Sequence, residues 1–208
     1  MSNTGNLNIA NVQVYAEAAA AEDRENGTFD GNFAADRYYY LWQGDHQTIP
    51  MGMYGEPEQF IDGMLTALPG LNAIRIPFNT LSFNTDGSLD PLFERFLIAA
   101  AERGLKIIPV LADGGAQQFD GTTQEILEAL KGPIFEDLKN AWQMMMSWMD
   151  NHPNVKTAVY GWELLNEPAS YDRAINNVTT QDKAAVQREA VDLYVKHMAE
   201  LSGMISAH

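Results

Sequence analysis

The chain has 208 residues, of which 46% are hydrophobic and 20% charged, a composition typical of one globular domain. Its formal net charge of −15 disfavours binding to nucleic-acid phosphates and to anionic lipid surfaces. It contains no cysteine, which excludes disulfides, thiolate metal sites and a cysteine nucleophile. Because neither a basic, apolar leader nor a run of ~18 apolar residues is visible, we expect no amino-terminal signal peptide and no membrane helix. Localisation stays open, although export would suit the acidic, cysteine-free composition.

The first part of the chain, residues 1–36, is predicted to be a loosely structured lead-in. It is rich in Ala, Asn, Gly, Asp and Glu, and only residues 11–16, "NVQVYA", show the alternation of one short strand. We expect the compact domain, residues 37–208, to begin with an aromatic strand over 37–43.

From residue 57 onward, helical and strand patterns alternate. Apolar residues four apart predict a helix over 57–70, with Gly70 as its stop signal. A strand is predicted over 72–79, and the following helix should begin with Asp90 as its cap and end at Gly104. The apolar face of that helix is Leu92, Phe93, Phe96, Leu97 and Ala100.

The alternation continues in the second half of the chain. Residues 105–113 form an apolar run that is typical of a strand buried on both faces of a parallel sheet. Thr122 and Glu125 predict a capping box for one helix, and apolar spacings of three and four predict another over 134–149. The last predicted strand covers residues 157–165.

A final helix is predicted over 182–207, capped by Thr179 or Thr180. Strands that alternate with helices at this spacing imply parallel βα units with right-handed crossovers. The predicted fold class is therefore α/β.

A carboxylate follows the last predicted strand in the tripeptide Asn166, Glu167 and Pro168. Proline cannot continue a strand ladder, so Glu167 should lie at the carboxyl end of the strand. In parallel α/β architectures this is the edge where ligands bind and chemistry takes place.

Three stretches resemble a known family: "IRIPFN" at 74–79, "ERGLKIIPVLAD" at 102–113 and "HPNVKTAVYGWELLNEP" at 152–168. They are similar to the retaining (β/α)₈-barrel glycoside hydrolases, most closely to family 5, the cellulases and β-mannanases. The resemblance covers roughly residues 37–205 and implies a TIM barrel with a β-linked polysaccharide such as mannan or glucan as its substrate.

The resemblance also implies roles for two residues. Glu167 would be the general acid/base, and Asn166 would contact the sugar 2-hydroxyl. Retention needs a second, nucleophilic carboxylate ~5 Å away, which in this family comes from the seventh strand. A barrel needs eight strands and only four are readable, so we expect the amino-terminal half of a TIM barrel, with the nucleophile outside this chain. The open edges would be covered by the remaining half or by a second copy.

Five further side chains are candidates for substrate binding, four of them with a structural alternative. Arg75 resembles the arginine of the family's site and could orient the nucleophile or pair with Glu163, and a purely structural ion pair is equally open. Asp113 could bind a sugar hydroxyl or simply be a solvated loop residue. His46 could line the site or lie on the surface. Aromatic stacking on sugar rings is predicted for Trp42, for which core packing is the default, and for Tyr171.

We expect no cofactor and no metal, because there is no glycine-rich phosphate loop and the four histidines lack ligand spacing. Two functional classes remain. One is a retaining, endo-acting glycoside hydrolase, and the other is a non-catalytic carbohydrate-binding or self-assembling half-barrel.

Overall fold

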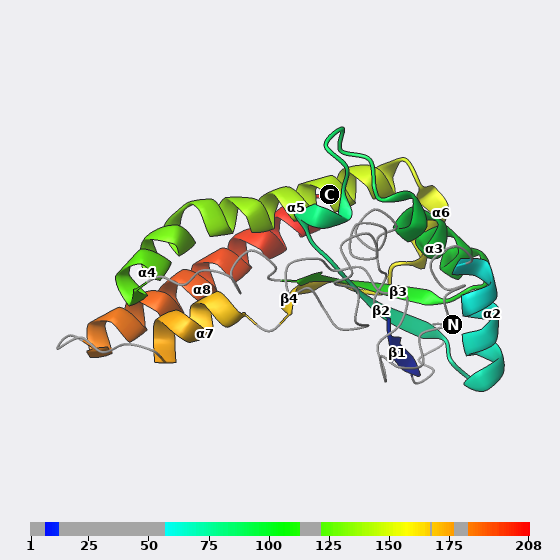
Figure 1. Ribbon diagram of the computed structural model, residues 1–208, viewed down its shortest axis with the longest axis horizontal. Helices are drawn as coiled ribbons and strands as arrows, with labels where there is room; N and C mark the ends of the chain where they lie inside the picture. The colour runs from blue at the N-terminus through cyan, green and yellow to red at the C-terminus, as the bar shows by residue number, and fades with distance from the viewer. Residues whose placement is uncertain (1–6, 13–56, 113–121, 167, 177–182) are drawn as a thin grey trace, which may run out of the picture.

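The computed structural model describes residues 7–12, 57–112, 122–166, 168–176 and 183–208. Its strands form one parallel sheet in the order β1-β2-β3-β4 (Figure 1). They are β1 (Ile9–Asn11), β2 (Ala73–Phe78), β3 (Lys106–Ala112) and β4 (Glu163–Asn166). The predicted α/β class with parallel βα units is therefore confirmed. That the sheet is half of a barrel stays a prediction.

The strand that precedes β2 in the sheet comes from the segment predicted to be a lead-in. β1 pairs with β2 from Ile9 to Asn11, and the N–H of Val12 donates to the carbonyl of Arg75 at 2.9 Å. The sheet thus begins before the predicted boundary at residue 37. Asparagines flanking Ile9 mask this strand in the sequence, because asparagine is disfavoured in strands. The aromatic strand predicted over 37–43 lies outside the described residues.

The first two described helices follow the prediction. They are α2 (Pro57–Ala67) and α3 (Pro91–Glu102). The carboxylate of Asp90 accepts hydrogen bonds from two backbone N–H groups of the first turn of α3, as a cap should. All five residues of the predicted apolar face of α3 are buried. The chain reverses after α3 at Gly104, whose φ of 74° favours glycine.

Two consecutive helices follow β3, α4 (Thr123–Lys131) and α5 (Pro133–Asp150). The capping box of α4 is confirmed: Thr122 and Glu125 each bond the backbone N–H of the other. Most apolar side chains of α5 are in the core, among them Leu138, Trp142, Met145 and Met149.

The strand predicted over 157–165 is wrong in its first part. Residues Pro153–Ala158 form a short helix, α6, and Val159 makes only an isolated bridge to Ile107 before β4 begins. Pro153 suits the first turn of a helix, and Val155 is buried in the core from that helix. Packing of Val155 thus overrides the β propensity of the segment.

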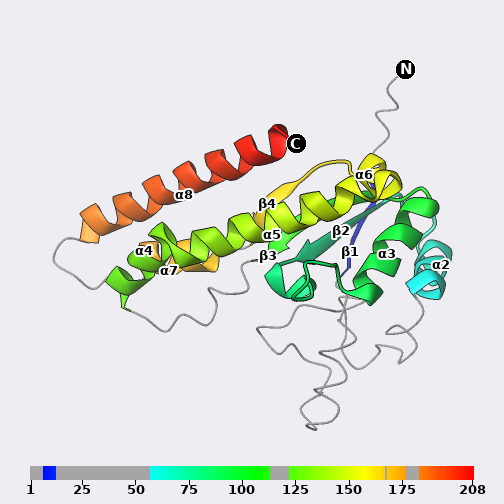
Figure 2. The same cartoon turned by 90° about the horizontal axis from the view of Figure 1, so that it is seen from above.

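Two helices complete the described chain, α7 (Ala169–Asn176), which the sequence did not predict, and α8 (Lys183–Ser206), which it did. The proposed caps Thr179 and Thr180 lie outside the described residues. Figures 1 and 2 show α4, α7 and the first half of α8 together beyond the end of the sheet.

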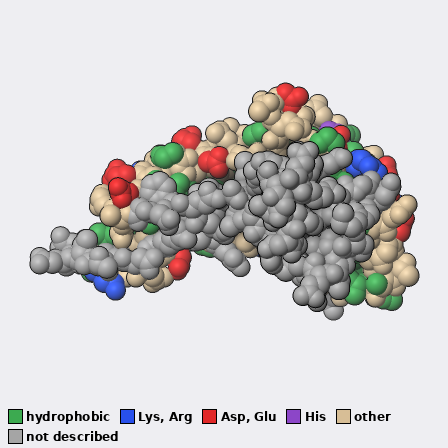
Figure 3. Space-filling view, viewed as in Figure 1, with side chains coloured by type: hydrophobic (Ala, Val, Ile, Leu, Met, Phe, Trp, Pro, Cys, Tyr) green, Lys and Arg blue, Asp and Glu red, His purple; other side chains and the backbone are tan. Residues whose placement is uncertain are grey.

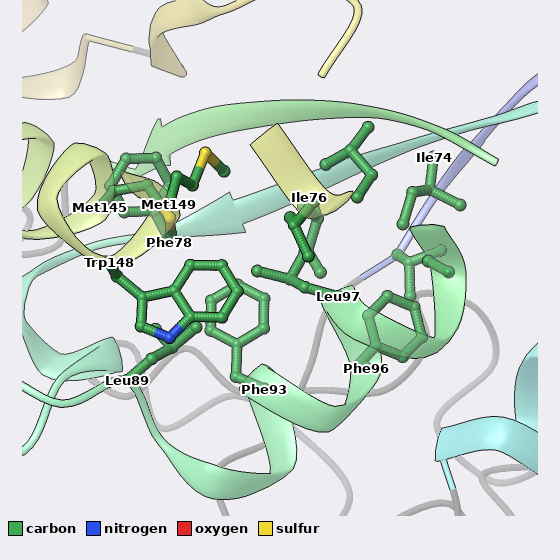
Figure 4. Close-up of a cluster of buried hydrophobic side chains, with 14 of the residues drawn as sticks. Ile74, Ile76, Phe78, Leu89, Phe93, Phe96, Leu97, Met145, Trp148 and Met149 are labelled. Atoms are coloured by element: carbon green, nitrogen blue, oxygen red, sulfur yellow. The ribbon is translucent and has the colours of Figure 1, made fainter. Parts of the chain in front are cut away.

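The main core lies between one face of the sheet and helices α3 and α5 (Figure 4). Ile74, Ile76 and Phe78 of β2 all point into it. Phe78 meets Trp142 edge to face, with ring centroids 4.7 Å apart. Because side chains alternate along a strand, Arg75 lies on the opposite face of the sheet.

Acidic side chains are spread over the helices in the space-filling view, in keeping with the net charge of −15 (Figure 3). None of the helices in the described ranges has the length and apolarity needed to cross a membrane.

Two glycines provide a matched test of the turn after α3. A Cβ at Gly63, inside α2, or at Gly104 would meet no atom within 4 Å. Gly63→Ala should stabilise the fold by roughly 0.5–1 kcal/mol, because alanine suits a helix and restricts the unfolded chain. Gly104→Ala should destabilise it by about 1 kcal/mol, because alanine resists a positive φ. Urea unfolding followed by circular dichroism measures the free energy of unfolding of both variants. Equal changes in the two variants would contradict a left-handed backbone conformation at Gly104.

Candidate functional site

Three polar side chains from two strands meet on the sheet face opposite the α3 and α5 core. The guanidinium of Arg75 on β2 donates from Nε to Oε2 of Glu163 on β4 at 2.6 Å, and from Nη2 to Oε1 of the same carboxylate. Nη2 also donates to Oδ1 of Asn166 at 2.8 Å. One arginine thus holds a carboxylate through both oxygens and an amide beside it.

The bridge spans an intervening strand. β3 lies between β2 and β4, and neighbouring strands are about 4.8 Å apart, so the two side chains together must cover roughly 10 Å. A long, forked side chain such as arginine can do this while bonding both carboxylate oxygens. The side chains of Arg75 and Glu163 are 25% and 38% exposed, so the pair is partly shielded from water and open on one side.

A bulge in β4 brings Glu163 and Asn166 to the same arginine. Val110 pairs with Glu163 and Ala112 with Asn166, so β4 advances three residues while β3 advances two. In a regular strand, residues three apart point to opposite faces. The extra residue cancels this alternation, and bulges of this kind are frequent beside functional sites.

The backbone of β4 is also supported from the helix layer. The indole Nε1 of Trp142 on α5 donates to the carbonyl of Leu164 at 3.2 Å. Trp162 meets Trp142 edge to face at 5.5 Å between ring centroids. Since Trp142 is fully buried, it holds β4 between the two residues that Arg75 binds. Sequence reasoning had placed Trp142 only in a helix core and missed this contact.

The structure brings together two of the predicted site residues, Arg75 and Asn166, and confirms the pairing of Arg75 with Glu163. Four others, Glu167, Trp42, His46 and Asp113, lie outside the described residues.

The prediction that Tyr171 stacks on a sugar is corrected. Its side chain is 1% exposed and its hydroxyl bonds Nδ1 of His197 at 2.7 Å, so its ring has no free face for a ligand. The reason is α7, which turns the residues after β4 inward against α8. The sequence signals for α7 were too weak to reveal this.

Asp137 is a second residue that the sequence did not single out. Its carboxylate accepts a hydrogen bond from the hydroxyl of Thr80 at 3.4 Å, just after the carboxyl end of β2. Burial raises the pKa of Asp137, and the Thr80 hydroxyl offsets part of that effect. It extends from α5, so it belongs to the helix layer and is separate from the Arg75 bridge.

Within the part of the chain that the structure describes, no cluster of three or more His, Asp or Glu side chains is arranged to hold a metal ion. Comparisons with protein-family models, with curated proteins and with solved structures found no match to this chain. The site must therefore be interpreted from its own chemistry and from the resemblance in its sequence.

Double-mutant cycles should separate the bridge from an ordinary surface ion pair. Arg103, directly after α3, bonds Asp62 of α2 in the same forked way, at 2.5 and 3.0 Å, but the side chain of Asp62 is 61% exposed. We expect a coupling free energy of about 1–2 kcal/mol for Arg75→Met with Glu163→Gln, because these groups are partly desolvated. The cycle of Arg103→Met with Asp62→Asn should give a clearly smaller value. Equal couplings, measured by urea unfolding, would contradict a shielded bridge.

Proposed function

We propose that this chain is the acid/base-bearing, amino-terminal half of a retaining (β/α)₈-barrel glycoside hydrolase that cleaves internal bonds of a β-linked polysaccharide such as mannan or glucan. The observation that carries the proposal is the bridge from Arg75 to Glu163 and Asn166, which ends immediately before Glu167. Polar side chains at the carboxyl end of a strand, on the sheet face away from the helices, suit the end of a barrel where catalytic residues gather.

The chemistry assigned to Glu167 is proton transfer to the glycosidic oxygen. An alkoxide is a poor leaving group, so bond cleavage needs a carboxylic acid that protonates the oxygen as the bond breaks. The same residue then acts as a base and takes a proton from the water that releases the glycosyl intermediate.

Asn166 is suited to orient the sugar. Its Oδ1 accepts from Arg75, so its Nδ2 amide is left to donate to a ligand oxygen, and no described residue occupies it. Arg75 therefore selects the amide orientation that offers a donor to the 2-hydroxyl. Glu163 neutralises the guanidinium and holds it in place.

Retention also requires a nucleophilic carboxylate on the other side of the anomeric carbon. The resemblance assigns it to the seventh strand of a complete barrel, whereas the described sheet has four strands. In this proposal the nucleophile and the rest of the barrel come from outside these residues, either from further sequence or from a second copy.

The second candidate is a non-catalytic carbohydrate-binding or self-assembling half-barrel. Partial exposure of every residue of β4, at one edge of the sheet, favours an edge that another chain segment can pair with. Such a module would bind oligosaccharide without releasing reducing sugar.

The test is the release of reducing sugar from β-mannan and β-glucan, measured for the chain and for the longest form that its gene encodes. Glu167→Gln should lower turnover about 10²- to 10⁴-fold while oligosaccharide binding, measured by calorimetry, persists. A glycoside with a dinitrophenol leaving group should lose far less in its first step, because that group leaves without a proton. Glu102→Gln, an exposed carboxylate at the end of α3, is the control and should retain full activity.

Two outcomes decide between the candidates. Binding of oligosaccharide without any release, accompanied by a dimer in light scattering, would support the non-catalytic module. Undiminished activity of Glu167→Gln would refute the assignment of the acid/base.

A further inference from the structure

A buried hydrogen bond joins the two helices that follow β4. The hydroxyl of Tyr171 on α7 and Nδ1 of His197 on α8 are 2.7 Å apart, and the two side chains are 1% and 3% exposed. Phe135 of α5 stacks on the imidazole with ring centroids 3.7 Å apart and planes 7° apart. The pair therefore connects three helices where a small core that includes Tyr171 meets the main core, to which Phe135 belongs.

This bond lies close in the chain to the candidate site. Tyr171 is five residues after Asn166, and Leu165, the residue before Asn166, packs against the same small core. Next to Tyr171, the N–H of Asp172 donates to the carbonyl of Pro168 at 2.9 Å and closes the first turn of α7. Asn166 is thus bonded to Arg75 on the sheet, and Tyr171, five residues later, is bonded to His197 in the helix layer.

We propose that Tyr171 and His197 are a positioning pair, which fixes the start of α7 and so keeps Asn166 on Arg75 in the orientation that binds a sugar hydroxyl. The proposal is argued from the two bonds at Asn166 and Tyr171, and its consequence for sugar affinity rests on the function proposed above. Tyr171 touches no ligand in this proposal and acts through the backbone between it and Asn166.

The surroundings of His197 make the pair sensitive to acid. Titratable and charged groups around the imidazole are Tyr171 on α7, Lys139 on α5, and Lys196 and Glu200 on α8 itself. Burial lowers the pKa of His197, the charges of Lys196 and Lys139 lower it further, and Glu200 opposes them. At neutral pH the imidazole is therefore uncharged.

Protonation leaves Nδ1 able only to donate, and it places a positive charge at a buried position that the charges of Lys196 and Lys139 already disfavour. The folded pKa lies below the unfolded value of about 6.5, so the unfolded chain takes up the proton first. The contribution of neutral His197 to the free energy of unfolding is therefore fully present above about pH 6.5, and it is lost as the pH falls from there to the folded pKa.

Three substitutions and one control test the pair. Tyr171→Phe and His197→Phe remove one partner of the bond and keep an aromatic ring in its place. His197→Asn retains a hydrogen-bonding group near the position of Nδ1 but cannot titrate. Tyr194→Phe is the control, because its ring packs edge to face on Tyr171 at 5.2 Å while the Tyr171–His197 bond does not involve its hydroxyl.

The first readout is hydrogen exchange at the Asp172 amide, which reports the opening of the first turn of α7. At pH 7, Tyr171→Phe and His197→Phe should speed this exchange about fivefold, the ratio expected for one net hydrogen bond. The amide of Glu94, bonded to Asp90 in α3, should not change. His197→Asn should exchange close to the wild-type rate. After correction for intrinsic rates, acidification should speed exchange at Asp172 in the wild type and not in His197→Asn.

The second readout is the affinity for a mannan or glucan oligosaccharide, which should weaken by about the same factor in Tyr171→Phe and recover in His197→Asn. Exchange at Asp172 that is unaffected by Tyr171→Phe, or an acid response equal in wild type and His197→Asn, would overturn the pair. If the wild type binds no oligosaccharide, the proposed function fails while the exchange data still decide the positioning of α7. Exchange at Asp172 in the wild type that does not respond to acid would also overturn the pair, and this measurement needs no variant to fold.

Discussion

The structure of the site depends on a charge bridge that crosses one strand of the sheet. Arg75 reaches from β2 over β3 to Glu163 and Asn166 on β4, so three neighbouring strands are tied together on the face away from the α3 and α5 core. The negative charge of Glu163 stabilises the partly shielded guanidinium of Arg75, and the forked guanidinium bonds both oxygens of that carboxylate. The amide of Asn166 takes its orientation from this pair, and the segment that carries Glu167 begins from it.

The end of β4 is constrained from three directions. The bulge turns Asn166 towards Arg75, the indole of Trp142 holds the carbonyl of Leu164, and the hydrogen bond of Tyr171 to His197 holds the helix that follows. A binding or catalytic site has to hold its polar groups within narrow limits, and support from packed neighbours is the usual way to do so. This convergence on one strand end supports the interpretation of the site more strongly than any single contact.

Sequence patterns predicted helix starts correctly where the start depends only on contacts within a few residues. The cap at Asp90 and the capping box of Thr122 with Glu125 depend on bonds within one helical turn, and both are present. The incorrect predictions concern segments whose secondary structure depends on contacts with residues far away in the sequence. The alternation predicts a short strand over residues 11–16, whereas β1 covers Ile9–Asn11, where the chain pairs with β2. Residues 157 and 158 were assigned to a strand, although packing of Val155 holds that segment in a helix.

The sequence by itself determined the succession of parallel βα units, the caps at Asp90 and Thr122 and the position of Asn166 at the end of a strand, because periodicity and turn chemistry act over a few residues. It also indicated that Arg75 and Glu163 could pair. Only the tertiary structure decided that Asn166 shares their network and that Tyr171 is buried against His197. Both depend on one extra residue in β4 and on the packing of α7 against α8, contacts between segments whose meeting no local pattern encodes.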